Sequence, residues 1–186
     1  MVTINPHAAR ERIAFEKLLY QSPAASPSDP QSDNSSILKS NNQTIQTLLI
    51  PETVQLPPVD FARVKAALPE ITAMGFSIEE FGRDTFKVDA VPQLVGSLAP
   101  AAMLSTIARD LAEGGARRGG ARWKEEIIAK SIARSFAGMS LALTEKGAMQ
   151  LVEELASCRV PYVDPRGKIT MFFLSTRELN RKFSRD

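Results

Sequence analysis

A histidine and a glutamate that could bind a metal ion lie near the start of the chain. His7 and Glu11 are four residues apart, so a helix would place both side chains on one face. A helix is predicted here because the side chain of Asn5 can cap the first turn, and Pro6 lacks an N–H that this turn leaves unbonded anyway. Histidine and carboxylate side chains together bind divalent metals. The first helix therefore carries the first candidate site.

Composition limits the class of protein. The 186 residues suit one domain or two small lobes, and 44% hydrophobic residues are enough for a sizeable core. A net charge of +2 creates no strong field toward nucleic acid, and no apolar run approaches the length of a membrane span. Zinc sites usually have several Cys and His ligands, whereas Cys158 and His7 are the only ones here. A single cysteine excludes an internal disulfide, and with no secretory signal it predicts a cytoplasmic protein without a membrane partner.

The spacing of apolar residues predicts a mixture of helices and strands. Residues 21–44 are mostly Ser, Pro, Asn, Asp and Gln and are predicted to form a flexible insertion. Pro69 is predicted to kink or split the helix that contains it. Because helices and strands do not alternate strictly, the predicted class is α+β. The expected helices are 6–20, 60–74, 100–113, 124–137, 144–157 and one from about 176, and the expected strands are 1–4, 45–56, 76–81, 86–91 and 169–174.

Two segments near the end of the chain are predicted to be buried. Met149, Val152 and Leu155 recur on one face of helix 144–157 and are expected to point inward. Residues 169–174 are densely apolar and are expected to form a strand that is buried on both faces. The Ser-Thr-Arg-Glu that follows is a capping box, which predicts the start of the last helix.

The first helix resembles a motif of the C-terminal domain of MutL mismatch repair proteins. That family carries Asp-Gln-His-Ala-x-x-Glu-x-x-x-x-Glu. Here His7, Glu11 and Glu16 match it in spacing, and Asn5 and the proline after it replace the Asp and the Gln. Later stretches resemble the family's Gln-x-Leu-Leu-Ile-Pro-Glu and Gly-Phe-x-Ile-x-x-Phe-Gly patterns in the same order. The matching stretches, which cover nearly the whole chain, are 46–54, 75–92, 131–138, 165–170 and 179–183.

The resemblance implies a two-lobed domain that forms a homodimer. Residues 1–50 and 135–186 would make the dimerisation lobe, and residues 51–134 the regulatory lobe. The ATPase arms of such a protein, with their ATP and magnesium, would lie outside this chain, and no cofactor is expected in this domain. The implied partners are other mismatch repair proteins, the replicative sliding clamp and, weakly, DNA. The implied location is the cytoplasm, in association with the nucleoid.

One stretch resembles the segment that, in this family, is similar to sliding-clamp docking motifs. It comprises Gln46, Leu48, Leu49, Ile50 and Pro51. The resemblance implies that the leucines enter an apolar pocket of the clamp while Gln46 anchors the rim. The alternative is that the segment is only a core strand, and one segment can serve both purposes.

Departures from the family pattern argue against nuclease activity. Many members are metal-dependent endonucleases, whose ligands come from the first-helix motif and a Cys-Pro-His turn. Here the motif's Asp falls on Asn5, the two thiols fall on Ser131 and Asp164, and the turn's histidine falls on Arg166. Arginine is a fixed cation and cannot ligate a metal. The resemblance therefore implies a domain without endonuclease activity, served by a separate protein that nicks the DNA.

Other interpretations of the same residues stay open. His7, Glu11 and Asp164 could form a three-ligand site, which would make the domain a metal-dependent DNA-nicking endonuclease with a non-standard ligand set. Alternatively, Glu11 and Asp164 simply pair with Arg166. A further possibility is an interaction module that has lost its repair role.

A basic, glycine-rich segment carries the only tryptophan. Arg117, Arg118, Arg122 and Lys124 are candidate DNA contacts in a mobile loop, where electrostatics would supply the affinity. The alternative is a solvated loop between two helices, whose charge the two glutamates that follow partly neutralise.

Overall fold

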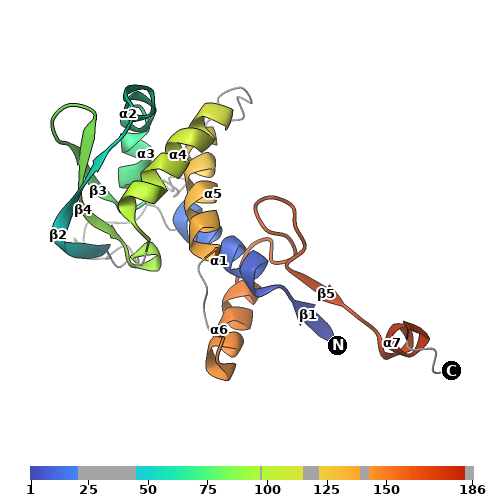
Figure 1. The fold of residues 1–186 in the computed structure, drawn as a ribbon. Helices are drawn as coiled ribbons and strands as arrows, with labels where there is room; N and C mark the ends of the chain where they lie inside the picture. The colour runs from blue at the N-terminus through green and yellow to red at the C-terminus, as the bar shows by residue number, and fades with distance from the viewer. Residues whose placement is uncertain (21–44, 97, 115–121, 139–142, 183–186) are drawn as a thin grey trace, which may run out of the picture.

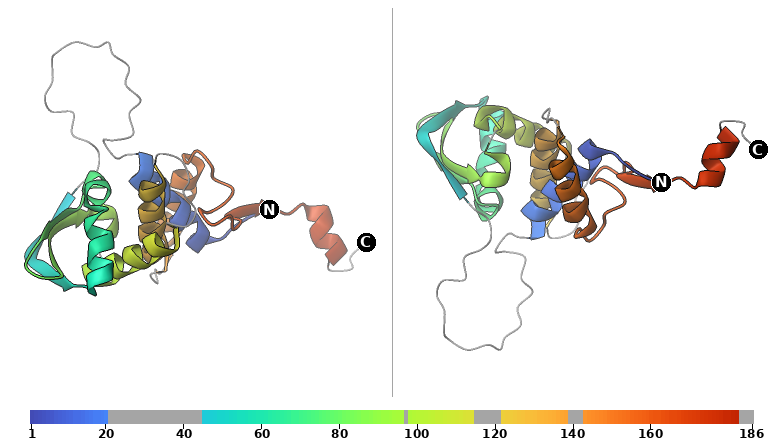
Figure 2. Two further views of the ribbon diagram at one scale, coloured as in Figure 1. Left: turned by 90° about the horizontal axis from the view of Figure 1, so that it is seen from above. Right: turned by 90° about the horizontal axis from the view of Figure 1, so that it is seen from below.

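The computed structural model describes residues 1–20, 45–96, 98–114, 122–138 and 143–182, and it confirms the predicted α+β class. Its elements are β1 (Val2–Ile4), α1 (Pro6–Tyr20), β2 (Ile45–Gln55), α2 (Pro58–Lys65), α3 (Leu68–Ala73), β3 (Ser77–Glu80), β4 (Thr85–Pro92), η2 (Gln93–Val95), α4 (Pro100–Gly114), α5 (Trp123–Ala137), α6 (Glu145–Ala156), β5 (Met171–Phe173) and α7 (Thr176–Lys182). One lobe is built on a three-stranded sheet, another holds both chain ends, and α1 and α5 lie between them (Figure 1 and Figure 2). No helix in the described ranges is long and apolar enough to span a membrane.

The predicted elements are largely confirmed. Helix α1 has the predicted bounds. The predicted cap at Thr144 is present, because its hydroxyl accepts from the backbone N–H of Gly147. The capping box at Ser175 is also present, because its hydroxyl accepts from the backbone N–H of Glu178. The expected helix 60–74 is divided into α2 and α3, with Pro69 in the first turn of α3, as the proline predicted. The predicted insertion 21–44 lies outside the described residues, and the lobe boundaries at 50 and 134 stay a prediction.

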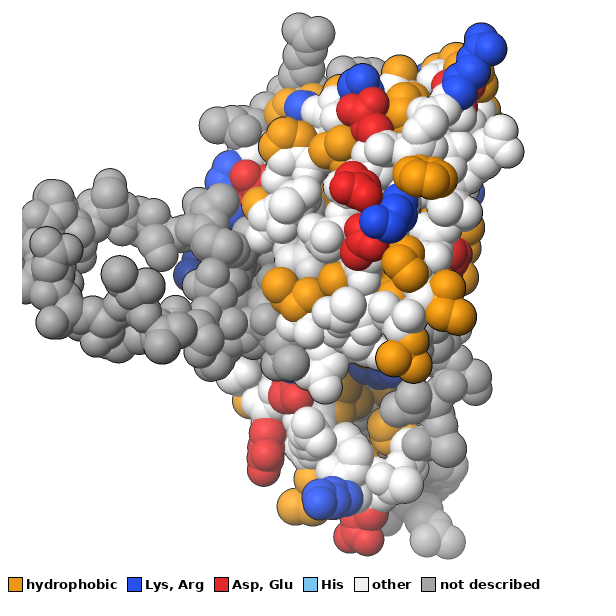
Figure 3. Space-filling model, turned by 90° about the vertical axis from the view of Figure 1, so that its left-hand side faces the viewer, with side chains coloured by type: hydrophobic (Ala, Val, Ile, Leu, Met, Phe, Trp, Pro, Cys, Tyr) orange, Lys and Arg blue, Asp and Glu red, His pale blue; other side chains and the backbone are white. Residues whose placement is uncertain are grey.

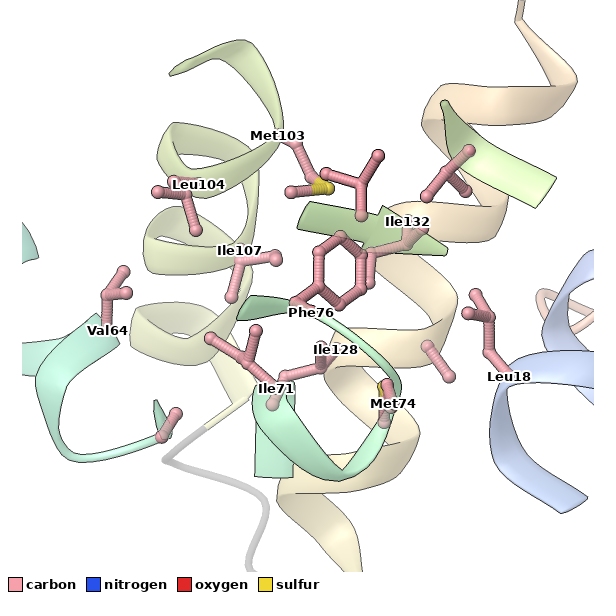
Figure 4. Close-up of a cluster of buried hydrophobic side chains, with 14 of the residues drawn as sticks. Leu18, Val64, Ile71, Met74, Phe76, Met103, Leu104, Ile107, Ile128 and Ile132 are labelled. Atoms are coloured by element: carbon pink, nitrogen blue, oxygen red, sulfur yellow. The ribbon is translucent and has the colours of Figure 1, made fainter. Parts of the chain in front are cut away.

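The larger lobe is an antiparallel sheet with one buried face. The strand order is β2-β4-β3. Phe86 and Val88 of β4 are fully buried, whereas Lys87 between them lies on the opposite face, 2.9 Å from Glu79 and 3.0 Å from Asp89. The buried face packs into the core formed with α2 to α5, part of which Figure 4 shows. Figure 3 views this end of the molecule, where charges of both signs lie among scattered hydrophobic side chains.

Helix α1 packs into two separate hydrophobic clusters. Phe15 and Leu18 belong to the large core, and Ala9 and Ile13 belong to a small cluster with Leu155 of α6. With both sides covered, the helix also buries three charged side chains, Glu11, Arg12 and Glu16. Buried charges are costly unless they are paired and hydrogen-bonded, so each of these side chains needs a partner from elsewhere in the chain.

The strand near the C-terminus is not buried as predicted. β1 pairs antiparallel with β5, with Val2 opposite Phe173. Phe172 and Phe173 expose 48% and 70% of their surface, and Ile169 just before the strand is also exposed. The expectation of a strand buried on both faces is therefore wrong for the single chain. The physical reason is that this sheet has only two strands, and the described residues place no second layer over these phenylalanines.

The predicted inward face of α6 is wrong for two of its three residues. Leu155 is fully buried, but Met149 and Val152 are exposed. Helix α6 packs on α1 through Leu155 with Leu151 beside it, so only one narrow stripe of the helix is covered. Beyond β5, helix α7 lies apart from the other helices in all the ribbon views (Figure 1 and Figure 2).

Candidate functional site

The side chain of Asn5 caps the start of α1. Its side-chain Oδ1 accepts from the backbone N–H groups of His7 and Ala8, at 3.1 and 3.2 Å. The predicted helix cap is therefore confirmed, and it satisfies amides that a helix start leaves without partners. Its backbone N–H donates to Thr170 O at 2.8 Å, which fixes the helix start to the turn that precedes β5.

His7 connects α1 to the end of α5. The side chain is exposed, and its Nδ1 lies 2.9 Å from the carbonyl oxygen of Ala137, the last residue of α5. That carbonyl is one of the four that a helix end leaves without an internal partner. The only histidine thus serves as a cap for a neighbouring helix.

Glu11 is buried beside an arginine. Arg166 Nη2 donates to Glu11 Oε2 at 2.6 Å, and Arg166 Nε lies 3.9 Å from Asp164 Oδ2. The other oxygen of Asp164 accepts from the backbone N–H groups of Arg166 and Lys168, both at 2.8 Å, which closes the turn. Burial raises the pKa of Glu11 above its usual value, against the opposing hydrogen bond and charge of Arg166. Pairing of both carboxylates with Arg166 is the alternative that the geometry favours.

A cavity of about 470 Å³ opens beside this pair. Ser131, the expected thiol position, does not face Glu11 but donates to Asp110 Oδ2 at 2.5 Å, where Arg134 also binds. Burial would raise the pKa of Asp110, but the hydrogen bonds from Ser131 and Arg134 and the charge of Arg134 outweigh it and hold that pKa below its usual value. Sequence reasoning missed Asp110 because it lies outside every motif. The lining residues are Glu11, Asp110, Glu113, Gly114, Ile127, Lys130, Arg134, Pro165 and Arg166.

The residues at the expected ligand positions do not fit a metal ion beside Glu11. The side chain of Asn5 caps a helix, that of His7 bonds to a carbonyl oxygen and that of Ser131 bonds to Asp110. Each of these side chains is therefore already engaged and is not available as a metal ligand beside Glu11. Among the described residues there is no group of three or more His, Cys, Asp or Glu side chains that could hold a metal. The alternative of a three-ligand site at His7, Glu11 and Asp164 is therefore not supported.

Glu16 and Arg12 bind the segment that follows α6. The carboxylate of Glu16 accepts from the backbone N–H groups of Arg159 and Val160, at 2.7 and 3.1 Å. Arg12 Nε donates to Val163 O at 2.6 Å, and Arg12 Nη1 lies 3.6 Å from Glu16 Oε1. Both side chains are buried. Glu16, the second glutamate of the motif, therefore binds the backbone of the segment that follows α6. Arg12 was missed by sequence reasoning because its partner is far away in the chain.

The segment expected to contact the clamp forms an exposed irregularity at the sheet edge. The pairing of β2 with β4 shifts register between Thr47 and Glu52. Leu49 is fully exposed and Ile50 is 81% exposed, whereas Leu48 is half-buried and packs against the core. Gln46 is exposed, and its side-chain Oε1 lies against Gly96, so a side chain at that glycine would require Gln46 to move. The segment is therefore both a core strand, through Leu48, and an apolar protrusion.

The basic segment is only partly described. Arg117 and Arg118 lie outside the described residues. Arg122 binds Glu125 at 2.5 Å and the carbonyl oxygen of Leu19 at 3.2 Å. Lys124 binds the carbonyl oxygen of Ala66 and lies 3.2 Å from Glu70. Arg122 and Lys124 are thus engaged within the domain.

Comparison with known proteins gives consistent matches. The family described as "MutL C terminal dimerisation domain" matches residues 35–138. The chain is similar to the DNA mismatch repair protein MutL of Endomicrobium trichonymphae (29% identity, 96% of this chain, 27% of the relative) and to that of Akkermansia muciniphila (30% identity, 98% and 26%). The MutL of Caulobacter vibrioides is 35% identical over 115 residues, which are 62% of this chain and 16% of the relative. Across the first two relatives, the chain spans about a quarter of the length of the protein it matches.

Proposed function

The chain belongs to the family of MutL C-terminal dimerisation domains, and on that premise we propose that it pairs two copies of a MutL-type DNA mismatch repair protein. The rest of such a protein, with its ATPase region and its ATP and magnesium, would lie outside this chain. Dimerisation brings two of those regions together, so that they can close around DNA and pass on the recognition of a mismatch. The domain itself needs no cofactor for this role.

The exposed apolar surface of the lobe with the chain ends carries this proposal. We assign the dimer interface to β1, β5, α6 and the segment between α6 and β5, where buried area would come from residues that a single chain leaves open. The members are Val2, Met149, Val152, Val160, Tyr162, Ile169, Phe172 and Phe173. Sedimentation of the isolated domain at micromolar concentration tests the proposal, because a dimer is expected and a monomer would contradict it.

We also propose that the domain lacks endonuclease activity and relies on a separate nuclease. The support is the fixed positive charge of Arg166 on Glu11, at the position where the endonuclease members of the family carry the histidine of their Cys-Pro-His turn. The wild-type domain is expected to leave supercoiled plasmid intact in the presence of manganese, like its Glu11→Ala variant. Nicking by the wild type that the Glu11→Ala variant loses would favour the alternative, an endonuclease with a non-standard ligand set.

We propose that Leu49 and Ile50 dock on the replicative sliding clamp. Because Leu49 makes no buried contact in the single chain, Leu49→Ala should leave the fold intact and remove a side chain that a clamp pocket would enclose. Loss of such an anchor costs more than 1 kcal/mol, so clamp affinity is expected to fall about tenfold.

Calorimetric titration of the clamp with the domain measures this loss. Gln55→Ala, at an exposed position on the same strand, is the matched control and should bind normally. No binding by any form of the domain would favour an interaction module with other partners.

Weak contact with DNA belongs to the same proposal, as do contacts with other repair proteins and a place in the cytoplasm near the nucleoid. Arg122 and Lys124 already have partners within the domain, and Arg117 and Arg118 carry the positive charge that phosphate contacts need.

A further inference from the structure

Two buried carboxylates share one guanidinium at the wall of the cavity. Glu11 and Asp164 are each 2% exposed. Arg166 reaches them from the turn, with distances of 2.6 Å to Glu11 and 3.9 Å to Asp164. Two buried carboxylates therefore depend on one half-exposed cation that is hydrogen-bonded to Glu11, and the charge of Arg134 also acts on Glu11. Removing the cation from such a group leaves uncompensated buried charge, which is strongly destabilising.

One oxygen of each carboxylate has no hydrogen-bond partner among the residues that the structure describes. These atoms are Glu11 Oε1 and Asp164 Oδ2, and both are inaccessible to solvent. Native proteins leave few buried polar atoms unpaired, and those that remain call for an explanation. Here the guanidinium approaches Asp164 too distantly for a hydrogen bond, and it uses only one oxygen of Glu11. The carboxylate pair thus has more acceptor oxygens than the N–H groups of Arg166 satisfy.

We propose that the guanidinium of Arg166 is the resident cation of this pair and replaces a divalent metal ion. Arginine is always charged and is attached to the chain, so the two carboxylates are compensated whether or not a metal is available. Its side chain is 43% exposed and lines the cavity of about 470 Å³. Glu11 lines the same cavity, and Asp164 lies behind Arg166. A shorter side chain at position 166 would leave the space between the two carboxylates open to a divalent cation from the cavity, and hard cations such as Mn²⁺ prefer oxygen ligands.

The Arg166→Ala variant tests this inference. In EDTA its melting temperature is expected to fall by roughly 5 °C, because the carboxylate pair loses its cation. Manganese is expected to restore most of that loss in the variant and to leave the wild type unchanged. Arg134→Ala is the matched control, since it removes another arginine of the same cavity whose partner is Asp110, and manganese should not restore its stability.

A second variant separates the charge from the fold. Arg166→Ala combined with Glu11→Gln removes one charge of each sign, so it should be more stable than Arg166→Ala alone and should not respond to manganese. If Arg166→Ala folds only with manganese, the inference is supported. An unchanged melting temperature, no effect of manganese on the variant, or an equal effect on the wild type would each overturn it. The readout is stability, so this result is independent of the nicking assay that tests the proposed function.

Discussion

Replacing Phe173 with aspartate is expected to convert the domain from a dimer into a monomer. The side chain is 70% exposed on β5, next to Phe172, within the surface assigned to the dimer interface. A carboxylate there would lose its hydration on association and would face the same charge of the partner if the two copies are related by a twofold axis. A cost of at least about 3 kcal/mol would raise the dissociation constant more than 100-fold.

Analytical ultracentrifugation over a range of concentrations measures this change. Phe81→Asp is the matched control, because Phe81 is also an exposed phenylalanine, 56% accessible, but lies in the hairpin of the other lobe. Its variant should remain dimeric. The assigned interface is wrong if the Phe173→Asp variant still forms a dimer. Dissociation of the Phe81→Asp control would instead place the interface on the lobe with the three-stranded sheet.

The Glu16→Ala variant is expected to lose about 3 kcal/mol of unfolding free energy. The buried carboxylate accepts from two backbone amides, those of Arg159 and Val160, and it lies beside the buried Arg12. Alanine leaves those amides without an acceptor and removes the carboxylate beside the guanidinium of Arg12, in a place that water does not reach easily. Urea unfolding at one fixed protein concentration measures the loss, because the stability of a dimer depends on concentration.

The control for this loss is Glu153→Ala, which removes an exposed glutamate of α6. Surface substitutions of this kind usually change stability by less than about 0.5 kcal/mol. If both variants unfold at the same urea concentration as the wild type, the contacts of Glu16 with the segment after α6 do not stabilise the domain.

Local signals in the sequence explain what could be predicted of the fold. The bounds of α1 follow from Asn5 and Pro6, which act within one helical turn, and the division between α2 and α3 follows from Pro69. Burial at Met149, Val152 and Phe173 could not be predicted in the same way. Apolar spacing shows that a face will be covered, but it does not show whether the same chain or a second copy covers it.

The candidate site depended on longer-range contacts. The resemblance placed Glu11, Asp164 and Arg166 in one region, and the structure brings them together. It gave no reason to expect that Ser131 would pair with Asp110, or that Glu16 would bind amides 143 and 144 residues further along the chain. Such contacts depend on how α1, α4 and α5 pack, and no local pattern records that packing.

Helix α1 contributes to both hydrophobic clusters, and this has a consequence for cooperativity. Loss of structure in either lobe would strip one side of the same helix, and so would weaken the contacts that hold the other lobe. The two lobes are therefore expected to lose their structure together, because both depend on contacts with the same helix.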